Sequence, residues 1–592
     1  MGATPGVEFP CVRDSQIHPS SILALGVLVA VAVISPWLFG AVQPWAILTV
    51  TAVGLLVVAL AFGWSALGPG AERPALPLWP LLAFAALGLA QLVPLPPALH
   101  ALLAPGSYEV WHPAPTAAAA VLGETAHPVS LDPDSTLRSV SLVLALALLA
   151  FLAAPALTRA RPAVAAVAAV AAGGFALSAY AIFARSRFGV LLYGRFEVPT
   201  INPFGPFVSK NHFAGYVTMA ALLAAGLAIG LADGARRRDR DWTTSPRAGT
   251  VVLAMVAALA MALAVLASLS RGGAIALAAG VASLLALLVV RARGGRRRTG
   301  LLPSLALAGV LGLAMAVMVP PATHERLRDL GGASFRLDTW RDAFRMSLSS
   351  PIVGQGLGAF HDAYPRFKEG HGRIRVEHAE NDYLETLAES GLLGLGAVLL
   401  GSALLLVGGG RGTLSGSDRV VRGIGIGALA GLIALAVHSA VDFNLRIPSN
   451  ATLAAVLAAT AAGATGVSRR PLSRSASVAL AVGALGLLAA VATRPADPSL
   501  SAREEARLVG VAATPEARAL RLERAERALG RVLRRRPAHA ESWLMLAGVR
   551  GAAGDLATAS SLAAHAVALD PERPSLREAA SRLMHDGSSV SP

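Results

Sequence analysis

Apolar blocks long enough to cross a lipid bilayer dominate the sequence and leave few folds open to the chain. A transmembrane helix needs about 20 mostly apolar residues. Thirteen blocks meet this description, at residues 21–41, 44–63, 76–96, 137–156, 162–184, 212–232, 250–268, 272–291, 301–320, 387–408, 422–441, 450–467 and 475–493. Because backbone groups in hydrocarbon must find partners within their own segment, the blocks predict an all-α, polytopic bundle of about 12–13 transmembrane helices. Prolines between residues 77 and 97 make the third and fourth blocks the weakest candidates.

Composition supports a membrane protein and limits its partners. Hydrophobic residues make up 54% of the chain and charged residues 15%, whereas soluble domains carry about 25% charged residues. In a soluble chain the net charge of +15 would suggest nucleic-acid binding. Here much of the basic excess lies in short loops between apolar blocks, as the positive-inside rule predicts, so we expect no nucleic-acid partner. Attraction to anionic membrane lipid or to a lipid-linked phosphate is the alternative explanation.

The basic loops predict the orientation of the bundle. Basic residues mark the cytoplasmic side of membrane proteins, and counting thirteen spans puts the basic segments of this chain on one side. These segments are TRAR (158–161), ARRRDRD (235–241), RARGGRRR (291–298), RGTLSGSDRVVR (411–422) and SRRPLSR (468–474). The prediction is therefore a cytoplasmic N-terminal tail at 1–20, a transmembrane domain at 21–493 and a large outward-facing loop at 321–386. The first apolar run lacks a convincing cleavage site, which predicts a retained span.

After residue 494 the chain becomes charged and helix-prone, and it contains a repeat. Pro537 and Pro571 are 34 residues apart, and each follows an Ala/Leu-rich helical pattern. Several nearby residues fall at tetratricopeptide-like positions, namely Trp543, Leu544, Gly548, Gly554, Ala557 and Ala564. A self-standing solenoid needs at least three repeats, so a generic helical hairpin is the alternative. We expect residues 494–592 to form a small outward-facing helical module that binds or scaffolds a protein partner.

Two cationic clusters begin spans on the predicted outer side. Lys210, Asn211 and His212 stand at the start of one span, and Arg271 stands in SLSRGG between two apolar blocks. An arginine deep in the membrane costs about 2.5–3.5 kcal/mol and usually has an anionic partner, but no acid lies nearby in the sequence. A guanidinium can bind phosphate through two hydrogen bonds, and the adjacent glycines would let the phosphate approach the backbone. Arg271 and Lys210 are therefore candidate phosphate ligands, with snorkelling at a helix end as the alternative.

The segment HAENDYLETLAESG places a histidine just above the membrane surface. His378 precedes a predicted helix that runs directly into a span. Because a histidine has a pKa near neutrality and can accept a proton from a hydroxyl, His378 is a candidate general base. Glu377, Glu380 and Asp382 are candidates to orient it, and Asn381 stands among them as a supporting residue. A structural histidine and a metal site are the alternatives, although no third and fourth metal ligands stand at a recognisable spacing.

A further polar cluster, HSAVDFNLRIP, contains His438 and Asp442 at i, i+4. Residues at this spacing share a helix face. Ionisable residues at the membrane boundary are functional candidates by default. Pairing of the two side chains as a structural lock is the alternative.

Signatures of several other enzyme classes are missing from the sequence. It contains no Walker-type phosphate loop, no DxD-like nucleotide motif in a soluble domain, no GxSxG and no CxxC. An enzyme that uses a soluble nucleotide sugar is therefore not expected, nor is a transporter with its own ATPase.

In their order along the chain, the polar motifs resemble the O-antigen ligase and polymerase superfamily. The resemblance is carried by KNHFAGY, SLSRGG, RLDTWRDAFRM, SPIVGQGLGAF, HAENDYLETLAESGLLG and HSAVDFNLRIP. It covers roughly residues 130–467, and LDPDSTLRS (131–139) is similar to a segment that precedes a span in repeat-bearing members. Each motif alone is weak, whereas the ordered set is fairly specific.

This resemblance implies an inverting, metal-independent glycosyltransferase of the all-helical GT-C type in the bacterial inner membrane, with no cofactor. Its donor would be an undecaprenyl-diphosphate-linked glycan on the periplasmic face, and its acceptor a hydroxyl of a glycan, of lipid A core or of a protein. Carried over, Arg271 and Lys210 match the diphosphate-binding positions, and His378 matches the base in the large loop. Lys210 stands where an arginine is expected, which keeps the charge and loses the bidentate fork. Arg336 is a further candidate ligand for phosphate or glycan.

Two functions from other classes compete with this interpretation. A transporter or flippase of a polyprenyl-linked or anionic substrate would carry charges in mid-span and repeated halves, and the sequence shows neither. A non-catalytic membrane scaffold for polysaccharide export would tolerate the loss of Arg271 and of His378.

Overall fold

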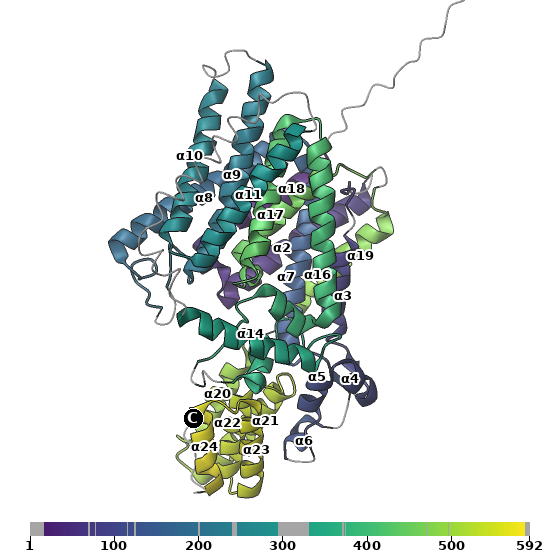
Figure 1. The fold of residues 1–592 in the computed structure, drawn as a ribbon. Coiled ribbons are helices and arrows are strands. Elements are labelled where there is room, and N and C mark those ends of the chain that lie inside the picture. Colours follow the sequence, from purple (N-terminus) through teal and green to yellow (C-terminus); the bar gives the residue numbers. More distant parts are fainter. Residues whose placement is uncertain are drawn as a thin grey trace, which may run out of the picture.

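The computed structural model describes residues 17–68, 72–76, 78–114, 117–123, 126–198, 202–238, 246–293, 331–369, 372, 374–468, 471–494 and 497–585. Regular structure in these residues is almost entirely helical, which confirms the all-α prediction. The exception is an antiparallel pair of two-residue strands, β1 (Pro94–Leu95) and β2 (His127–Pro128). A bundle of long helices occupies one part of the molecule, and shorter helices gather at one of its ends (Figure 1).

Ten helices within the described ranges are long and apolar enough to cross a membrane. They are α1 (Pro19–Ile34, extended by η1 to Trp37), α2 (Pro44–Leu67), α7 (Pro133–Ala153, extended by η3 to Thr158), α8 (Ala160–Phe188), α9 (Lys210–Arg238), α10 (Pro246–Ala267), α11 (Arg271–Arg293), α16 (Asp382–Ser415), α17 (Arg419–His438) and α19 (Arg474–Ala492). Each coincides with one of the predicted apolar blocks. The chain is therefore a multi-pass membrane protein.

The other three predicted blocks have different outcomes. Block 301–320 lies outside the described residues. Block 450–467 forms α18 (Pro448–Ala464), which has 17 residues. Block 76–96 contains only the 12-residue helix α3 (Trp79–Ala90). Proline lies at the start of α3, and the proline-rich stretch beyond it forms β1 and a turn, so the helix has little room to extend.

Although α3 is only about 18 Å long, its flanking residues connect the two ends of the bundle. The Ala75 N–H donates to the carbonyl oxygen of Gly466, beyond the end of α18, at 3.0 Å. At the other end of α3, the Gln91 side-chain amide donates to the carbonyl oxygen of Val353, in the segment before α16, at 2.7 Å. Segment 75–91 thus passes from one end of the bundle to the other, as a membrane span would.

The two ends of the bundle carry different residues. We call the end that bears residues 331–381 the loop face, and the opposite end the basic face. Helix ends at the basic face, and the residues beside them, carry the arginines Arg159, Arg161, Arg291, Arg411, Arg419, Arg422 and Arg474. The chain after α19 continues on the loop face, where the C-terminal helices lie below α14 in Figure 1.

Small residues bring α9 and α17 close together at the centre of the bundle. A Cβ added at Gly226 would lie 2.7 Å from the Cα of Gly427, and one added at Gly230 would lie 2.6 Å from the carbonyl oxygen of Val420. Close approach at small residues is a common way for membrane helices to pack. This packing holds the later turns of α9 against α17, while Lys210 lies in its first turn at the loop face.

The motif SPIVGQGLGAF inserts where α16 is broken. Gly391 has φ 62° and ψ −167°, which interrupts the helix. Beyond the break, the Leu392 N–H donates to the carbonyl oxygen of Pro351 at 2.8 Å, and the Leu393 N–H to that of Ile352 at 3.2 Å. A side chain at Gly391 would collide with Ile352, since an added Cβ would lie 2.3 Å from its carbonyl oxygen. The inserted segment therefore fixes the first two turns of α16.

A second group of helices covers the loop face. It comprises α4 (Pro97–Leu103), α5 (Pro105–Trp111), α6 (Ala117–Leu122), α14 (Gly331–Ser349), α15 (Phe360–Ala363), η6 (Tyr364–Phe367), α20 (Pro498–Val509), α21 (Pro515–Leu533), α22 (Ala540–Ala552), α23 (Leu556–Leu569) and α24 (Pro574–His585). Helices α20–α24 form the C-terminal module, and their tetratricopeptide character stays a prediction. One apolar core joins them to the loop, with Trp111, Phe360, Tyr364, Leu529 and Trp543 among its buried members.

Candidate functional site

A cavity of about 1400 Å³ lies at the loop face of the bundle. Seven of the ten predicted site residues line it: Lys210, Asn211, Arg271, Arg336, His378, Glu380 and Asp442. They come from the starts of α9 and α11, from helix α14, from the segment before α16 and from the segment after α17. The remaining three, Asn381, Asp382 and His438, are buried in the structure around it and are not among the lining residues.

Lys210 and Arg271 begin the neighbouring helices α9 and α11. The Lys210 Nζ donates to the carbonyl oxygen of Leu269 at 3.1 Å. The Ser270 hydroxyl donates to Asn211 Oδ1 at 2.8 Å. These bonds join the start of α9 to the turn before α11, so both predicted phosphate ligands lie in one part of the cavity wall. The N-termini of the two helices add partial positive charge there.

The glycines after Arg271 serve helix packing, whereas their role in admitting a phosphate stays a prediction. A Cβ added at Gly272 would lie 2.9 Å from His438 Nε2, and one added at Gly273 would lie 2.4 Å from the Cβ of Ala214. Any larger residue would therefore push α11 away from α17 or from α9. Gly272 also lines the cavity, but the neighbouring helices already explain why these positions are glycine.

His378 is held by Glu385, a residue in the first turn of α16. His378 Nδ1 lies 2.8 Å from Glu385 Oε1, and the Ala379 N–H donates to Glu385 Oε2 at 2.8 Å. The imidazole stacks on the ring of Phe443 with 4.2 Å between centroids, and 32% of its side chain is exposed. Burial by itself would lower the pKa of His378, but the Glu385 carboxylate outweighs it and raises the pKa above its ordinary value. With Nδ1 directed at a carboxylate, Nε2 is the nitrogen that can accept a proton.

Among the described residues, the structure shows no hydrogen bond from His378 to the carboxylates that were predicted to orient it. Glu380 Oε2 lies 3.2 Å from an Nη of Arg336, and burial raises the pKa of Glu380. Asp382 accepts a hydrogen bond from the Ser439 hydroxyl at 2.7 Å and so holds the turn after α17. Glu377 lies in the cavity wall. The prediction that these acids orient the histidine was therefore wrong, and Glu385 has that position.

Glu385, Glu389 and Arg446 form a buried ion-pair cluster that the sequence analysis missed. Arg446 lies 3.3 Å from Glu385 Oε1 through Nε and 2.6 Å from Glu389 Oε2 through an Nη. Both glutamate side chains are 1% exposed. Two acids spaced i, i+4 at the start of a membrane helix were the available signal, because such a pair needs a cation when it is buried.

The other supporting residues hold the cavity wall together. Asn381 caps α16 by accepting a hydrogen bond from the Tyr383 N–H at 3.0 Å. Asp442 lies 3.7 Å from His438 and 3.4 Å from His212, and all three side chains are buried. Burial would raise the pKa of Asp442, but its contacts with the two histidines lower it to about 2. Asp442 therefore stays ionised and ties α9 to the end of α17.

Residues 256–400 match the family model described as O-antigen ligase. Over this segment the match supports the predicted relationship to the O-antigen ligase and polymerase superfamily. The match covers about a quarter of the chain and contains Arg271, Arg336, His378 and Glu385, whereas Lys210 and the C-terminal module lie outside it. No curated protein matches the chain.

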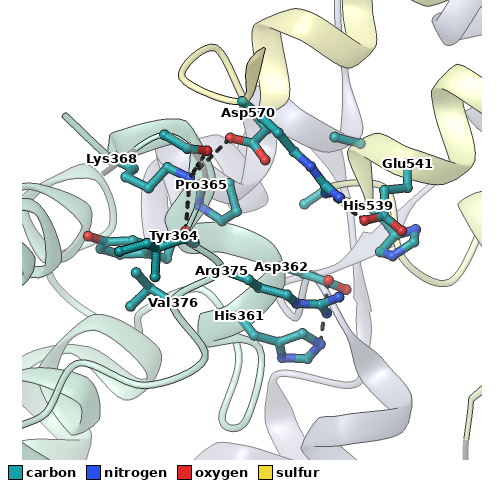
Figure 2. Close-up of a pocket in the computed structure, with 15 residues that line it drawn as sticks. His361, Asp362, Tyr364, Pro365, Lys368, Arg375, Val376, His539, Glu541 and Asp570 are labelled. Atoms are coloured by element: carbon teal, nitrogen blue, oxygen red, sulfur yellow. Dashed lines mark hydrogen bonds and ion pairs between the residues drawn. The ribbon is translucent and has the colours of Figure 1, made fainter. Parts of the chain in front are cut away.

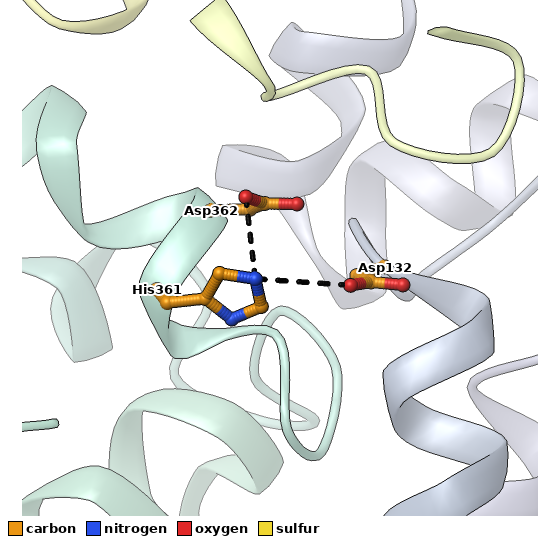
Figure 3. A group of neighbouring side chains, drawn as sticks. All are labelled: Asp132, His361 and Asp362. Atoms are coloured by element: carbon orange, nitrogen blue, oxygen red, sulfur yellow. Dashed lines mark ion pairs between the residues drawn. The ribbon is translucent and has the colours of Figure 1, made fainter. Parts of the chain in front are cut away.

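Three side chains near the C-terminal module lie together in a way that resembles a metal site. Asp132, His361 and Asp362 bring one ligand atom each within 4.8 Å of one another (Figure 3). The guanidinium of Arg536 already lies against them, 2.6 Å from Asp362 and 3.6 Å from Asp132. Although burial opposes it, the charges of His361 and Arg536 hold the pKa of Asp362 far below its usual range. We therefore interpret the group as an ion-pair cluster centred on Arg536.

A smaller cavity of about 90 Å³ lies where the loop before α16 meets the C-terminal module (Figure 2). Lys368 from the loop side lies 3.6 Å from Asp570 at the end of α23. A water molecule takes about 30 Å³ in the liquid, so this space suits a few waters rather than a glycan. It belongs to a closely packed contact between the loop and the module.

Proposed function

We propose that the chain transfers a glycan from an undecaprenyl-diphosphate-linked donor to an acceptor hydroxyl at the periplasmic face of the bacterial inner membrane. One observation carries the proposal: one cavity is lined by cations, Lys210, Arg271 and Arg336 among them, and by a histidine that faces a buried carboxylate, His378 with Glu385. Such a transfer needs positive charge for the leaving diphosphate and a base for the acceptor hydroxyl.

The cavity lining suits both parts of a lipid-linked donor. Apolar residues at the start of α2 and on α7 share the lining with the cations, among them Trp45, Leu48 and Leu142. Trp45 is 54% exposed, as expected for a residue that faces lipid near the membrane boundary. We propose that the polyprenyl chain lies along these residues while Lys210 and Arg271 bind the diphosphate.

The proposed reaction balances without a cofactor. The acceptor oxygen attacks the anomeric carbon, the bond from that carbon to the diphosphate oxygen breaks, and the electron pair leaves with undecaprenyl diphosphate. The acceptor proton moves to Nε2 of His378, and Glu385 stabilises the imidazolium that forms. Because Lys210 and Arg271 stabilise the leaving charge, this mechanism requires no divalent metal. Attack on the face opposite the leaving group inverts the anomeric centre.

The identity of the acceptor stays open. A lipid A core, a second repeat unit, a protein hydroxyl and an exopolysaccharide chain all offer the required hydroxyl. The periplasmic position of the loop face is also part of the proposal, and it is supported by the arginines of the basic face, which the positive-inside rule assigns to the cytoplasm.

Complementation of a strain that lacks this protein tests the proposal. We expect wild type to restore long glycans, and Arg271→Ala and His378→Ala to leave them absent while lipid-linked precursor accumulates. Arg195→Ala is the matched control, because Arg195 is exposed in the connection between α8 and α9 and does not line the cavity. Full glycan and an unchanged precursor pool in both cavity variants would refute the proposal, and the missing band in a positive result would identify the acceptor.

A further inference from the structure

The C-terminal module docks on the segment that begins α7. Asp132 and Asp134, both 1% exposed, stand in the LDPDSTLRS motif. Asp132 lies 3.6 Å from Arg536 of the module. Asp134 forms ion pairs with Arg494 and, at 3.5 Å, with Arg535. The motif at the start of α7 thus supplies buried carboxylates to arginines of the module and of the connection that leads into it.

The C-terminal module also contacts the loop before α16. The Arg536 guanidinium donates two hydrogen bonds to Asp362, at 2.6 and 2.9 Å, and one to Asp497 at 3.2 Å. The Arg536 side chain is only 7% exposed. Loss of one partner of a buried, hydrogen-bonded ion pair is strongly destabilising, so this contact resists separation. Together with the shared apolar core, it makes the module a fixed part of the loop face.

Several of these docking residues also line the large cavity at the loop face. The large cavity is lined by Arg494, Asp497 and Arg536 from the module side, by Asp132, Ser135, Arg138 and Ser139 from α7, and by His361 and Arg375 from the loop. We call this part of the lining the module wall. It is distinct from the start of α9 and α11, which carries Lys210 and Arg271.

The chemistry of the module wall differs from that of a phosphate site. Carboxylates, hydroxyls and guanidinium groups alternate there, and the Arg138 guanidinium donates to the Ser135 hydroxyl at 3.0 Å. Arg536 lies against Asp132 and Asp497, and Arg494 lies against Asp134, so much of the positive charge in this wall is already paired with carboxylates. Sugar hydroxyls both donate and accept hydrogen bonds, so they can pair with every group in such a mixed wall.

We propose that the module wall is the subsite for a hydroxyl-rich acceptor glycan. Ser135 and Arg138 contact the sugar, and Arg536 acts as a positioning residue that holds the module against the loop. This inference rests on the proposed function, and it assigns the C-terminal module to acceptor binding in the same cavity. It also favours a carbohydrate acceptor over a protein hydroxyl.

Hydrogen exchange on the purified full-length protein in detergent tests the subsite with two separate probes. The first probe is undecaprenyl diphosphate, and the second is the soluble glycan released by mild acid from the cell's own lipid-linked precursor. We expect the lipid to protect residues 208–212 and 269–273, and the glycan to protect residues 132–139 and 361–376. Protection by the lipid without any protection by the glycan at the module wall would overturn the subsite and leave the proposed function standing. Absence of lipid protection at both cationic segments would instead contradict the proposed function.

Variants make the test specific. Arg138→Ala should weaken glycan binding about tenfold, as expected for loss of a charged hydrogen-bonding group, and should leave binding of undecaprenyl diphosphate unchanged. Arg536→Ala should weaken glycan binding while α21–α23 keep their exchange protection, and Arg536→Lys should restore part of the affinity. Arg550→Ala is the control, because Arg550 pairs with Glu526 inside the module and does not line the cavity. Unchanged glycan affinity in both Arg138→Ala and Arg536→Ala would contradict the proposal.

Discussion

His378 and Glu385 lie 2.8 Å apart, with Nδ1 of the imidazole facing Oε1 of the carboxylate. Seven residues separate them in the sequence, and they meet because the chain turns back at Glu380, whose φ is +55°. The pair resembles the base and orienting acid of many hydrolytic and transfer enzymes, in which a carboxylate fixes the tautomer of a histidine. Arg446 Nε lies 3.3 Å from the same Oε1, and its positive charge favours the ionised form of this buried carboxylate.

This arrangement predicts a defined pH dependence of glycan transfer. The base must be neutral, and Glu385 raises the pKa of His378 above its ordinary value. Transfer should therefore increase as the pH rises through that elevated pKa and then reach a plateau. Glu385→Gln removes the charge that favours the imidazolium, so the inflection should move to lower pH. Glu377→Gln should leave the inflection in place, and an identical pH profile for wild type and Glu385→Gln would contradict the role of this pair.

Substitution of Gln91, which does not line the cavity, should strongly lower the stability of the protein. Its amide donates to the carbonyl oxygens of Val353 and Glu389 at 2.7 and 2.8 Å, and its Oε1 accepts from the Leu357 N–H at 3.0 Å. Each buried group left without a partner costs about 1–3 kcal/mol, so Gln91→Leu should lower the free energy of unfolding by roughly 3 kcal/mol or more. Thermal unfolding in detergent measures the change. Gln43→Leu, at an exposed position before α2, should have little effect.

Metal removal should leave glycan transfer unchanged. Lys210 and Arg271 supply the positive charge at one part of the cavity, and Arg536 neutralises the carboxylates of Asp132 and Asp362 at another. Transfer measured in vesicles before and after treatment with EDTA should therefore proceed at the same rate. A strict requirement for a divalent cation, restored by adding that cation back, would contradict the proposed base mechanism.

The topology predicts which sites a membrane-impermeant thiol reagent can label. In a Cys11→Ser background, Glu523→Cys on the C-terminal module and Ser415→Cys at the basic face provide single exposed thiols. Intact spheroplasts should be labelled at position 523, and position 415 should react only after the membrane is permeabilised. The reverse pattern would place the loop face in the cytoplasm.

Much of the bundle could be predicted because a membrane span depends on local composition. Any segment of sufficient apolar length forms a helix in hydrocarbon, so the blocks that became α9 and α11 could be located from their residues alone. The parity of the spans then put Lys210 and Arg271 on one side, and the structure places both in the wall of one cavity. Segment 76–96 departed from its prediction because its prolines leave room for only the short helix α3.

Contacts made by turns and by distant segments could not be predicted in the same way. Glu377, Glu380 and Asp382 were predicted to orient His378 because they lie near it in the sequence, but the chain turns at Glu380, whose φ is positive. The partner of His378 depends on that turn and therefore on the three-dimensional path of the backbone. The contact between Asp132 and Arg536 joins residues about 400 positions apart, and nothing local in either segment specifies the other.

The most direct measurement is the release of undecaprenyl diphosphate by purified protein in proteoliposomes that contain the lipid-linked donor and an acceptor glycan. Wild type should release one undecaprenyl diphosphate for each glycosidic bond that it forms. Release by His378→Ala should be slower than release by wild type by about 10²–10⁴-fold, the usual contribution of a general base. Release by Arg271→Ala should also stay below the wild-type rate, even at high donor concentration. Wild-type rates of release in both variants, with both proteins folded, would contradict the account.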